Sequence, residues 1–220
     1  MKIRAVLKNR FLLVVVFLAL GLTPAAPGAS TDSKSSEGDP TDLIGRFHTT
    51  LLGVMKEAKA LGVRGRYERL EPAVREIFSL PLMIRIAAGT HWSKGSDAER
   101  QRLAEAFERM SVATYADRFD GYSGESFETV GRKPGPQATT LVETKLLRPK
   151  DDPIEITYVM REVRGEWRIV DVLLESGISE LARYRSEYAK ILKDRGLDGL
   201  IAELEAKTAK MLGPSVAGQR

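Results

Sequence analysis

The chain contains no cysteine and only two histidines among its 220 residues. Without cysteine it can form no disulfide, no thiolate metal site and no cysteine nucleophile. His48 and His91 match none of the two-ligand spacings, such as H-x-x-x-H, that zinc sites use. We therefore interpret both as surface or capping residues, and we expect neither a metal nor another cofactor.

Motifs of common enzyme classes are also missing. The sequence has no G-x-S-x-G, no G-x-x-x-x-G-K-[ST] and no G-x-G-x-x-G. Asp171 is the most unusual acid, because it follows an apolar stretch and a buried carboxylate needs a partner. We expect it to pair with an arginine, with Arg185 as the candidate. The alternative is a catalytic dyad with Tyr158 in a cavity enzyme of the isomerase or dehydratase type.

Positive charge is concentrated at the N-terminus. Residues 1–10 hold four basic side chains and no acid, and residues 11–22 are apolar apart from one glycine. A basic segment, a short apolar segment and small residues up to position 29 form the pattern of a secretory signal peptide. Twelve apolar residues are fewer than the roughly 20 that cross a hydrocarbon core. We expect residues 1–29 to be removed during export to the periplasm, with an uncleaved membrane anchor as the alternative.

The balance of charge changes when this segment is removed. The full chain has 34 basic and 30 acidic residues, and four of the basic ones lie in residues 1–29, so the remainder is formally neutral. No basic run is longer than two residues. A protein that neutralises phosphates along a nucleic acid needs a basic surface. The sequence therefore argues against nucleic acid as a partner.

The remaining length of about 190 residues suits one domain. Residues 30–40 lack the apolar side chains of a packed segment, so we predict a flexible leader there, a single domain over 41–212 and a loose tail over 213–220. A capping pattern, Ser96-Asp-Ala-Glu99, marks one helix start. Apolar spacings of three and four predict helices over 41–60, 67–77, 83–88, 97–119, 179–194 and 197–212.

The pattern changes to a period of two between residues 125 and 174. Alternation predicts strands over 125–130, 138–147, 154–161 and 166–174, joined by turns at 131–136, 148–153 and 164–165. Short turns between successive strands indicate an antiparallel meander of four strands. The last strand has apolar residues on both faces, which predicts a sheet covered on both sides. Helices, then strands, then helices is an α+β order.

Large, adaptable apolar side chains are frequent on the predicted inner surfaces. Methionine and aromatic side chains suit a cavity for irregular apolar ligands, but they equally suit an ordinary core, and periodicity does not distinguish the two. The candidate ligand-binding residues are Met83, Ile84, Trp92, Phe107, Met110, Tyr115, Tyr158, Met160, Trp167, Tyr184 and Tyr188.

Several segments resemble the MlaC-type lipid-binding proteins, also called the toluene-tolerance family. Residues 78–92 are similar to the family's FDxxxMARxxLGxxW region, and residues 165–172 to its G-x-W-K-V-x-D-V strand. Further matching segments are residues 96–100, 107–116, 177–179, 184–188 and 196–201. The order and spacing of these segments, which span about residues 40–212, carry the resemblance rather than any single motif.

The resemblance implies a curved antiparallel sheet wrapped by N- and C-terminal helices around an apolar pocket. It also implies a periplasmic, non-enzymatic lipid carrier with transient membrane contact. Its partners would be an inner-membrane ABC-transporter complex and an outer-membrane lipoprotein complex. Residues 178–181 and 185–188 lean toward the hopanoid-associated HpnM branch, so the implied ligand is a phospholipid or a hopanoid. A ligand-free periplasmic adaptor is the remaining alternative, and it predicts a solid core.

Overall fold

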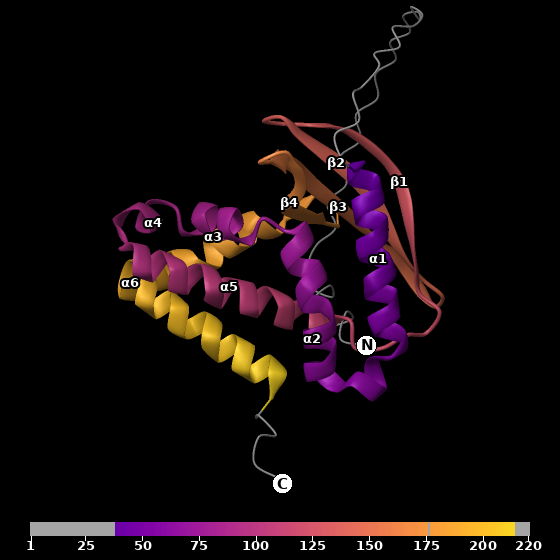
Figure 1. Ribbon diagram of the computed structural model, residues 1–220, viewed down its shortest axis with the longest axis horizontal. Helices are drawn as coiled ribbons and strands as arrows, with labels where there is room; N and C mark the ends of the chain where they lie inside the picture. Colours follow the sequence, from indigo (N-terminus) through magenta and orange to yellow (C-terminus); the bar gives the residue numbers. More distant parts are fainter. Residues whose placement is uncertain (1–37, 176, 214–220) are drawn as a thin grey trace, which may run out of the picture.

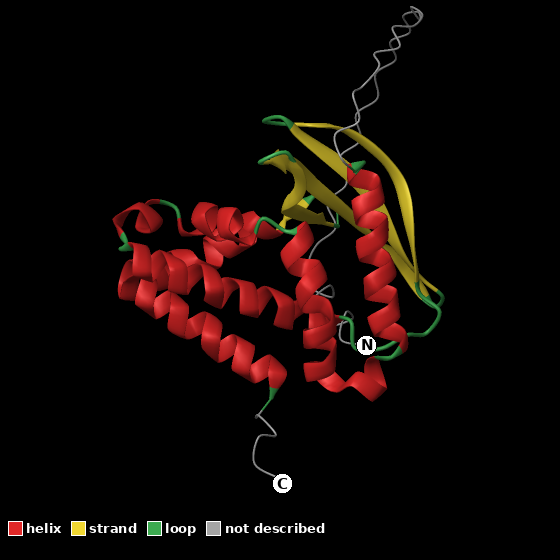
Figure 2. Cartoon of the chain, in the orientation of Figure 1, coloured by secondary structure: helices red, strands yellow, loops and turns green. Residues whose placement is uncertain are grey.

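The computed structural model describes residues 38–175 and 177–213, and it places six helices and five strands in them (Figure 1). The predicted signal peptide, most of the leader and most of the tail lie outside the described residues. Figure 2 shows the strands gathered in one curved layer and most of the helices packed on one side of it. This is the α+β organisation that the order of sequence patterns predicted.

Four of the six helices described, α1, α3, α5 and α6, begin at a side-chain cap or at a proline in the first turn. Their bounds are α1 Pro40–Lys56, α2 Ala58–Ile77, α3 Leu80–Ala88, α4 Thr90–Lys94, α5 Asp97–Arg118 and α6 Glu180–Leu212. Ser96 and Glu99 form the predicted capping box at the start of α5. Gly62 interrupts α2 and Gly196 interrupts α6, at φ of +59° and +65°. A residue with a side chain is strained at such positive φ values, so glycine suits both breaks.

The five strands form one open antiparallel sheet in the order β1-β2-β3-β4-β5. Their bounds are β1 Ser126–Gly135, β2 Thr139–Arg148, β3 Asp151–Val163, β4 Glu166–Leu174 and β5 Ile178–Ser179. The prediction of four strands was therefore wrong by one, because β5 has only two residues and no detectable alternation. The turn predicted at 131–136 was also misplaced. The chain absorbs an irregularity in register between Thr129 and Gly131 and continues as β1 to Gly135.

One face of the sheet is buried. Its members are at most 8% exposed: Val142, Thr144, Leu146, Ile154, Ile156, Tyr158, Met160, Ile169 and Val172. Along β3 these residues alternate with exposed or half-buried ones, so a single face is covered. The prediction of a sheet covered on both sides, which came from apolar residues at both odd and even positions of β4, was therefore wrong. The register shifts between the pairs Val159↔Asp171 and Met160↔Ile169, which turns residues on both sides of this β-bulge toward the same face.

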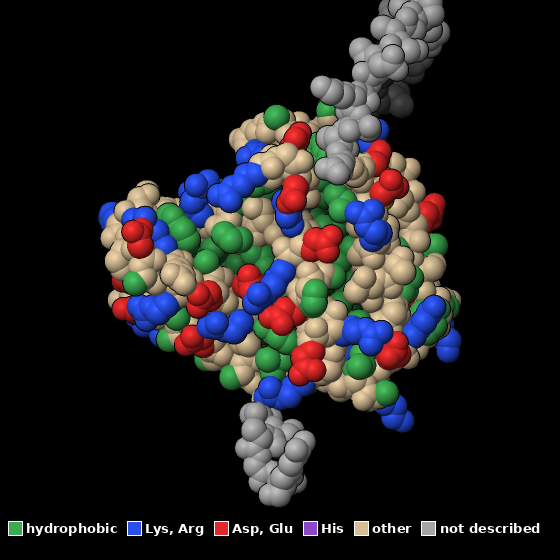
Figure 3. Space-filling view, viewed as in Figure 1, with side chains coloured by type: hydrophobic (Ala, Val, Ile, Leu, Met, Phe, Trp, Pro, Cys, Tyr) green, Lys and Arg blue, Asp and Glu red, His purple; other side chains and the backbone are tan. Residues whose placement is uncertain are grey.

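Helix α5 lies at the centre of the helical part, in contact with α2, α3 and α6, while α1 packs against β1 and β2 (Figure 1). One hydrophobic core joins the buried face of the sheet to these helices. Figure 3 shows basic and acidic side chains interspersed over the visible face, as expected for a formally neutral body. Among the described helices, none is both long enough and apolar enough to span a membrane.

Candidate ligand-binding cavity

A cavity of about 130 Å³ lies between the buried face of the sheet and helices α2, α3, α5 and α6. Strands β2, β3 and β4 supply one wall: Leu146, Ile154, Ile156, Tyr158, Val172 and Leu174. The helices and the residues that follow them supply the other: Val74, Phe78, Leu80, Met83, Phe107, Ser111, Thr114, Tyr115, Arg118, Phe119, Glu180 and Tyr184. The interior of the domain is therefore not completely filled by its own side chains.

The polar groups within the cavity are largely engaged by the protein itself. The Ser111 hydroxyl donates to the carbonyl of Phe107 at 2.7 Å, and the Thr114 hydroxyl donates to the carbonyl of Met110 at 2.8 Å. Because both hydroxyl protons are donated to carbonyl groups of the same helix, neither hydroxyl requires a ligand as its hydrogen-bond acceptor. The cavity thus provides apolar contact area with few directed hydrogen bonds.

Tyr158 points into the cavity from β3, and its hydroxyl meets a buried histidine from α1. His48 Nε2 and Tyr158 Oη are 3.0 Å apart, and the His48 ring stacks on Phe127 with centroids 3.9 Å apart. Burial lowers the pKa of His48 to about 4 and raises the pKa of Tyr158 well above its ordinary value. Both groups are therefore neutral near pH 7, and the pair satisfies two buried polar groups. The prediction that His48 lies at the surface or caps a helix was wrong, since only 4% of this residue is exposed.

Charged residues mark the boundary of the cavity beside α6. Arg118 lies 3.7 Å from the Glu180 carboxylate, and Arg183 donates to the same carboxylate at 2.8 Å. Burial by itself would raise the pKa of Glu180. The hydrogen bonds and charges of Arg183 and Arg118 outweigh that effect and hold the pKa below its usual value. The carboxylate is therefore ionised and paired at the edge of an otherwise apolar space.

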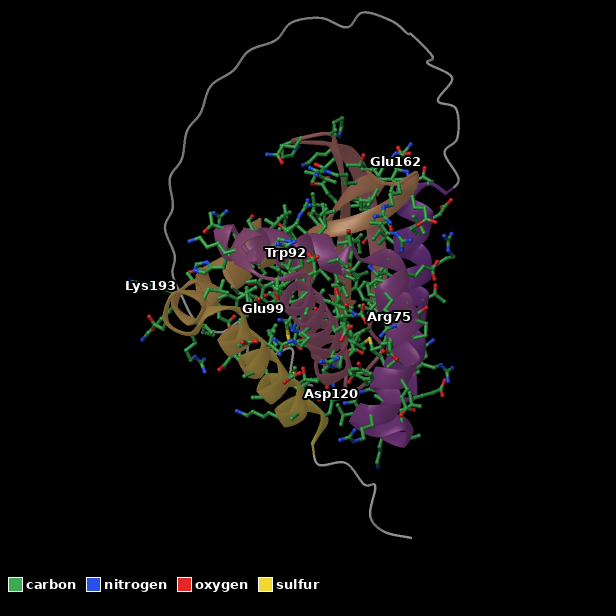
Figure 4. All side chains as sticks on the ribbon, turned by 60° about the vertical axis from the view of Figure 1, so that its left-hand side comes forward. Arg75, Trp92, Glu99, Asp120, Glu162 and Lys193 are labelled. Carbon is green, nitrogen blue, oxygen red and sulfur yellow. The ribbon has the colours of Figure 1, made fainter. Side chains whose placement is uncertain are left out.

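The structure brings together five of the eleven candidate residues at this cavity: Met83, Phe107, Tyr115, Tyr158 and Tyr184. Met110 and Tyr188, with Tyr184 again, line a second cavity between α5 and α6. Ile84 and Met160 are fully buried in the core away from both cavities. Trp92 on α4 (Figure 4) and Trp167 on β4 are half-buried and pack against the core.

The aliphatic wall of the sheet was missed. The cavity is also lined by Ile154, Ile156 and Val172, which are smaller than the methionines and aromatics predicted to bind the ligand. The alternation of residues 154–160 carried the necessary signal, because it places Ile154 and Ile156 on the same face as Tyr158. Val172 was harder to find, since the bulge in β4 changes its face.

Asp171 has a structural role on the opposite side of the sheet from Tyr158. It pairs across the strands with Val159, the neighbour of Tyr158, so the two side chains point in opposite directions and form no dyad. Its carboxylate accepts hydrogen bonds from the Val172 amide at 2.8 Å, the Ser179 hydroxyl at 2.5 Å and the Leu181 amide at 3.0 Å. The expected pairing with Arg185 was therefore wrong: Asp171 ties the start of α6 to the sheet.

A metal centre finds no support in the described part of the chain. His91 is half-buried in α4, and the described residues contain no group of three or more histidine or acidic side chains that could hold a metal ion.

The family model described as "MlaC protein" matches residues 46–206, which is well over half of the chain. The chain belongs to the MlaC family. Among solved structures, it is similar to a phospholipid-binding protein from Ralstonia solanacearum, determined in complex with a phospholipid. The TM-score is 0.70 at 15% sequence identity, over 80% of this chain and 100% of the other. At this identity the likeness establishes that this MlaC-family chain shares the fold.

Proposed function

We propose that this MlaC-family protein is a periplasmic lipid carrier whose cavity holds the acyl chains of a lipid. The observation that carries the proposal is the apolar cavity between the sheet and helices α2, α3, α5 and α6. Support comes from family membership and from the similar fold of a protein determined with a bound phospholipid. The cavity also argues against a ligand-free adaptor, which predicts a solid core.

The physical need for such a carrier follows from the cost of exposing acyl chains to water. Two chains of about 16 carbons cost roughly 25 kcal/mol, at about 0.8 kcal/mol per methylene. Spontaneous passage of the lipid through an aqueous compartment is therefore negligible. A protein that covers the chains removes this cost and needs no catalytic group. The position of Tyr158 and Asp171 on opposite faces of the sheet, where they form no dyad, is consistent with a carrier of this kind.

Loading also requires the cavity walls to move apart. A volume of about 130 Å³ is below the roughly 300–1,000 Å³ of sites that enclose drug-sized ligands. The walls come from separate elements that meet through side chains, so the sheet and the helices must separate as acyl chains enter. The accessory partners that we propose are the inner-membrane ABC-transporter complex and the outer-membrane lipoprotein complex implied by the family resemblance.

The lipid-carrier proposal is tested by adjacent substitutions on β3. Ile156 lines the cavity, whereas Thr157 points to the opposite face. Ile156→Asp places a carboxylate against the acyl chains and is expected to abolish lipid loading from liposomes, measured by mass spectrometry of the extracted protein. Thr157→Asp adds the same charge to the other face and is expected to load lipid normally.

A second variant separates loss of binding from loss of folding. Ser111→Phe introduces an aromatic ring at the cavity wall without burying a charge, and it is expected to reduce loading while circular dichroism stays unchanged. If wild-type protein repeatedly carries no lipid after incubation with liposomes, the carrier proposal is wrong. Full loading by folded Ile156→Asp and Ser111→Phe variants would show that the lipid binds elsewhere.

A further inference from the structure

A second cavity of about 220 Å³ lies between α5 and α6, directly beside the first. The two cavities share Thr114, Arg118 and Tyr184 as lining residues. Their chemistry differs sharply, because the first is mostly apolar and the second is lined by four basic side chains: Arg118, Arg183, Lys207 and Lys210. An apolar compartment thus adjoins a cationic one.

The positive charge of the second cavity is only partly compensated. Glu187 also lines it and contacts both Arg183, at 3.1 Å, and Lys207. Glu180, at the edge of the first cavity, contacts Arg118 and Arg183. Lys210 forms no ion pair with any described residue. Four cations against two carboxylates leave an excess of two positive charges at one place on a formally neutral body.

We propose that the second cavity binds the phosphate group of the lipid whose acyl chains occupy the first cavity. This inference rests on the proposed carrier function and deepens it by assigning a binding site to the phosphate. Arginine and lysine are the side chains that best recognise phosphate, arginine through paired N–H donors and lysine as a point charge. A phosphate at the shared boundary would add negative charge where the cations are in excess. The site therefore favours phospholipids over hopanoids and other lipids without a phosphate.

The test compares two lipids that differ only in the phosphate-bearing headgroup. Lipid-free wild-type protein is incubated, until the loaded composition is constant, with liposomes of phosphatidylglycerol that contain diacylglycerol with the same acyl chains as a minor component. The ratio of the two lipids in the re-isolated protein, relative to that in the liposomes, is measured by mass spectrometry. We expect enrichment of phosphatidylglycerol, and we expect Lys207→Gln/Lys210→Gln to reduce that enrichment by on the order of tenfold.

Matched controls come from the same helix. Lys190→Gln/Lys193→Gln also removes two exposed lysines from α6 but lies outside both cavities, and Figure 4 shows Lys193 at the outer edge of the molecule. This variant is expected to retain the wild-type enrichment. Because exposed charge interactions are screened by salt, the enrichment is also expected to decrease between low salt and about 0.5 M salt.

The outcomes separate this inference from the carrier function. If wild-type protein loads neither lipid, the carrier function itself fails. Loading of both lipids without enrichment, or an enrichment that Lys207→Gln/Lys210→Gln leaves unchanged, overturns the phosphate site and leaves the carrier function standing. Two further measurements, of glycerol 1-phosphate binding and of co-sedimentation with vesicles, test whether the lysines bind free phosphate esters or membrane surfaces. If glycerol 1-phosphate binding or vesicle co-sedimentation changes in this variant while enrichment does not, the lysines bind free phosphate esters or membrane surfaces instead.

Discussion

Acidification should destabilise the protein through His48, and the burial of this side chain sets the size of the effect. The ordinary pKa of histidine is 6.5, and burial lowers the pKa of His48 to about 4 in the folded protein. Between these values the unfolded chain binds a proton that the folded protein excludes. Stability is therefore lost as pH falls through the window from about 6.5 to about 4.

The magnitude follows from the two pKa values. Each pKa unit corresponds to about 1.4 kcal/mol, so the full loss from this group is about 3 kcal/mol once the pH is below 4. Between pH 7 and pH 5 the loss is about 2 kcal/mol. For a domain whose free energy of unfolding is about 5–15 kcal/mol, this is a substantial fraction.

The assay is urea unfolding of the wild type and of His48→Gln at several pH values. The free energy of unfolding of the wild type is expected to fall by about 2 kcal/mol more than that of His48→Gln between pH 7 and pH 5. His91→Gln, which removes the other histidine of the chain, is expected to keep the steep decline. Parallel pH profiles for the wild type and His48→Gln would refute the reasoning, because they would mean that His48 is protonated as easily in the folded protein as in the unfolded chain.

Two further predictions concern the elements that position the cavity. Asp171→Ala removes three accepted hydrogen bonds, two of them from the start of α6 and one from the Val172 amide in β4, and is expected to cost about 2 kcal/mol in urea unfolding. An unchanged midpoint would contradict the anchoring role. Gly196→Ala is expected to cost about 1 kcal/mol, because Gly196 has a φ of +65°. Its control, Gly45→Ala, lies inside α1 with open space around the added methyl group and is expected to gain about 0.5–1 kcal/mol. Equal thermal midpoints for these two variants would show that alanine at position 196 is not strained.

Local signals predicted most of the secondary structure. The capping box at Ser96 and Glu99 and the breaks near Gly62 and Gly196 depend on side chains within a few residues of one another, so they are visible in the sequence. The alternation in residues 154–160 identified β3 for the same reason. Irregular features were less accessible. The extension of β1 through Gly131 and the two-residue strand β5 depend on pairing with neighbouring strands, which a local pattern does not contain.

The candidate site was predictable in character but only partly in detail. Tyr158 and Phe107 were chosen because they are large and lie on predicted inner surfaces, and both line the cavity. Met160 satisfies the same criteria but is sealed in the core. What separates these residues is the distance between the sheet and the facing helices at each position. That distance depends on how the whole set of elements packs.

The amino-acid sequence by itself determined the α+β order and the similarity to the MlaC family, because both depend on the order and spacing of residues. Only the tertiary structure decided that the bulge in β4 turns Val172 inward, that His48 meets Tyr158 across 110 positions of sequence, and that four cations from α5 and α6 gather beside an apolar cavity. The physical reason is that burial, pairing and local charge arise from contacts between elements. Such contacts join residues that are distant in the sequence, so no local pattern indicates them.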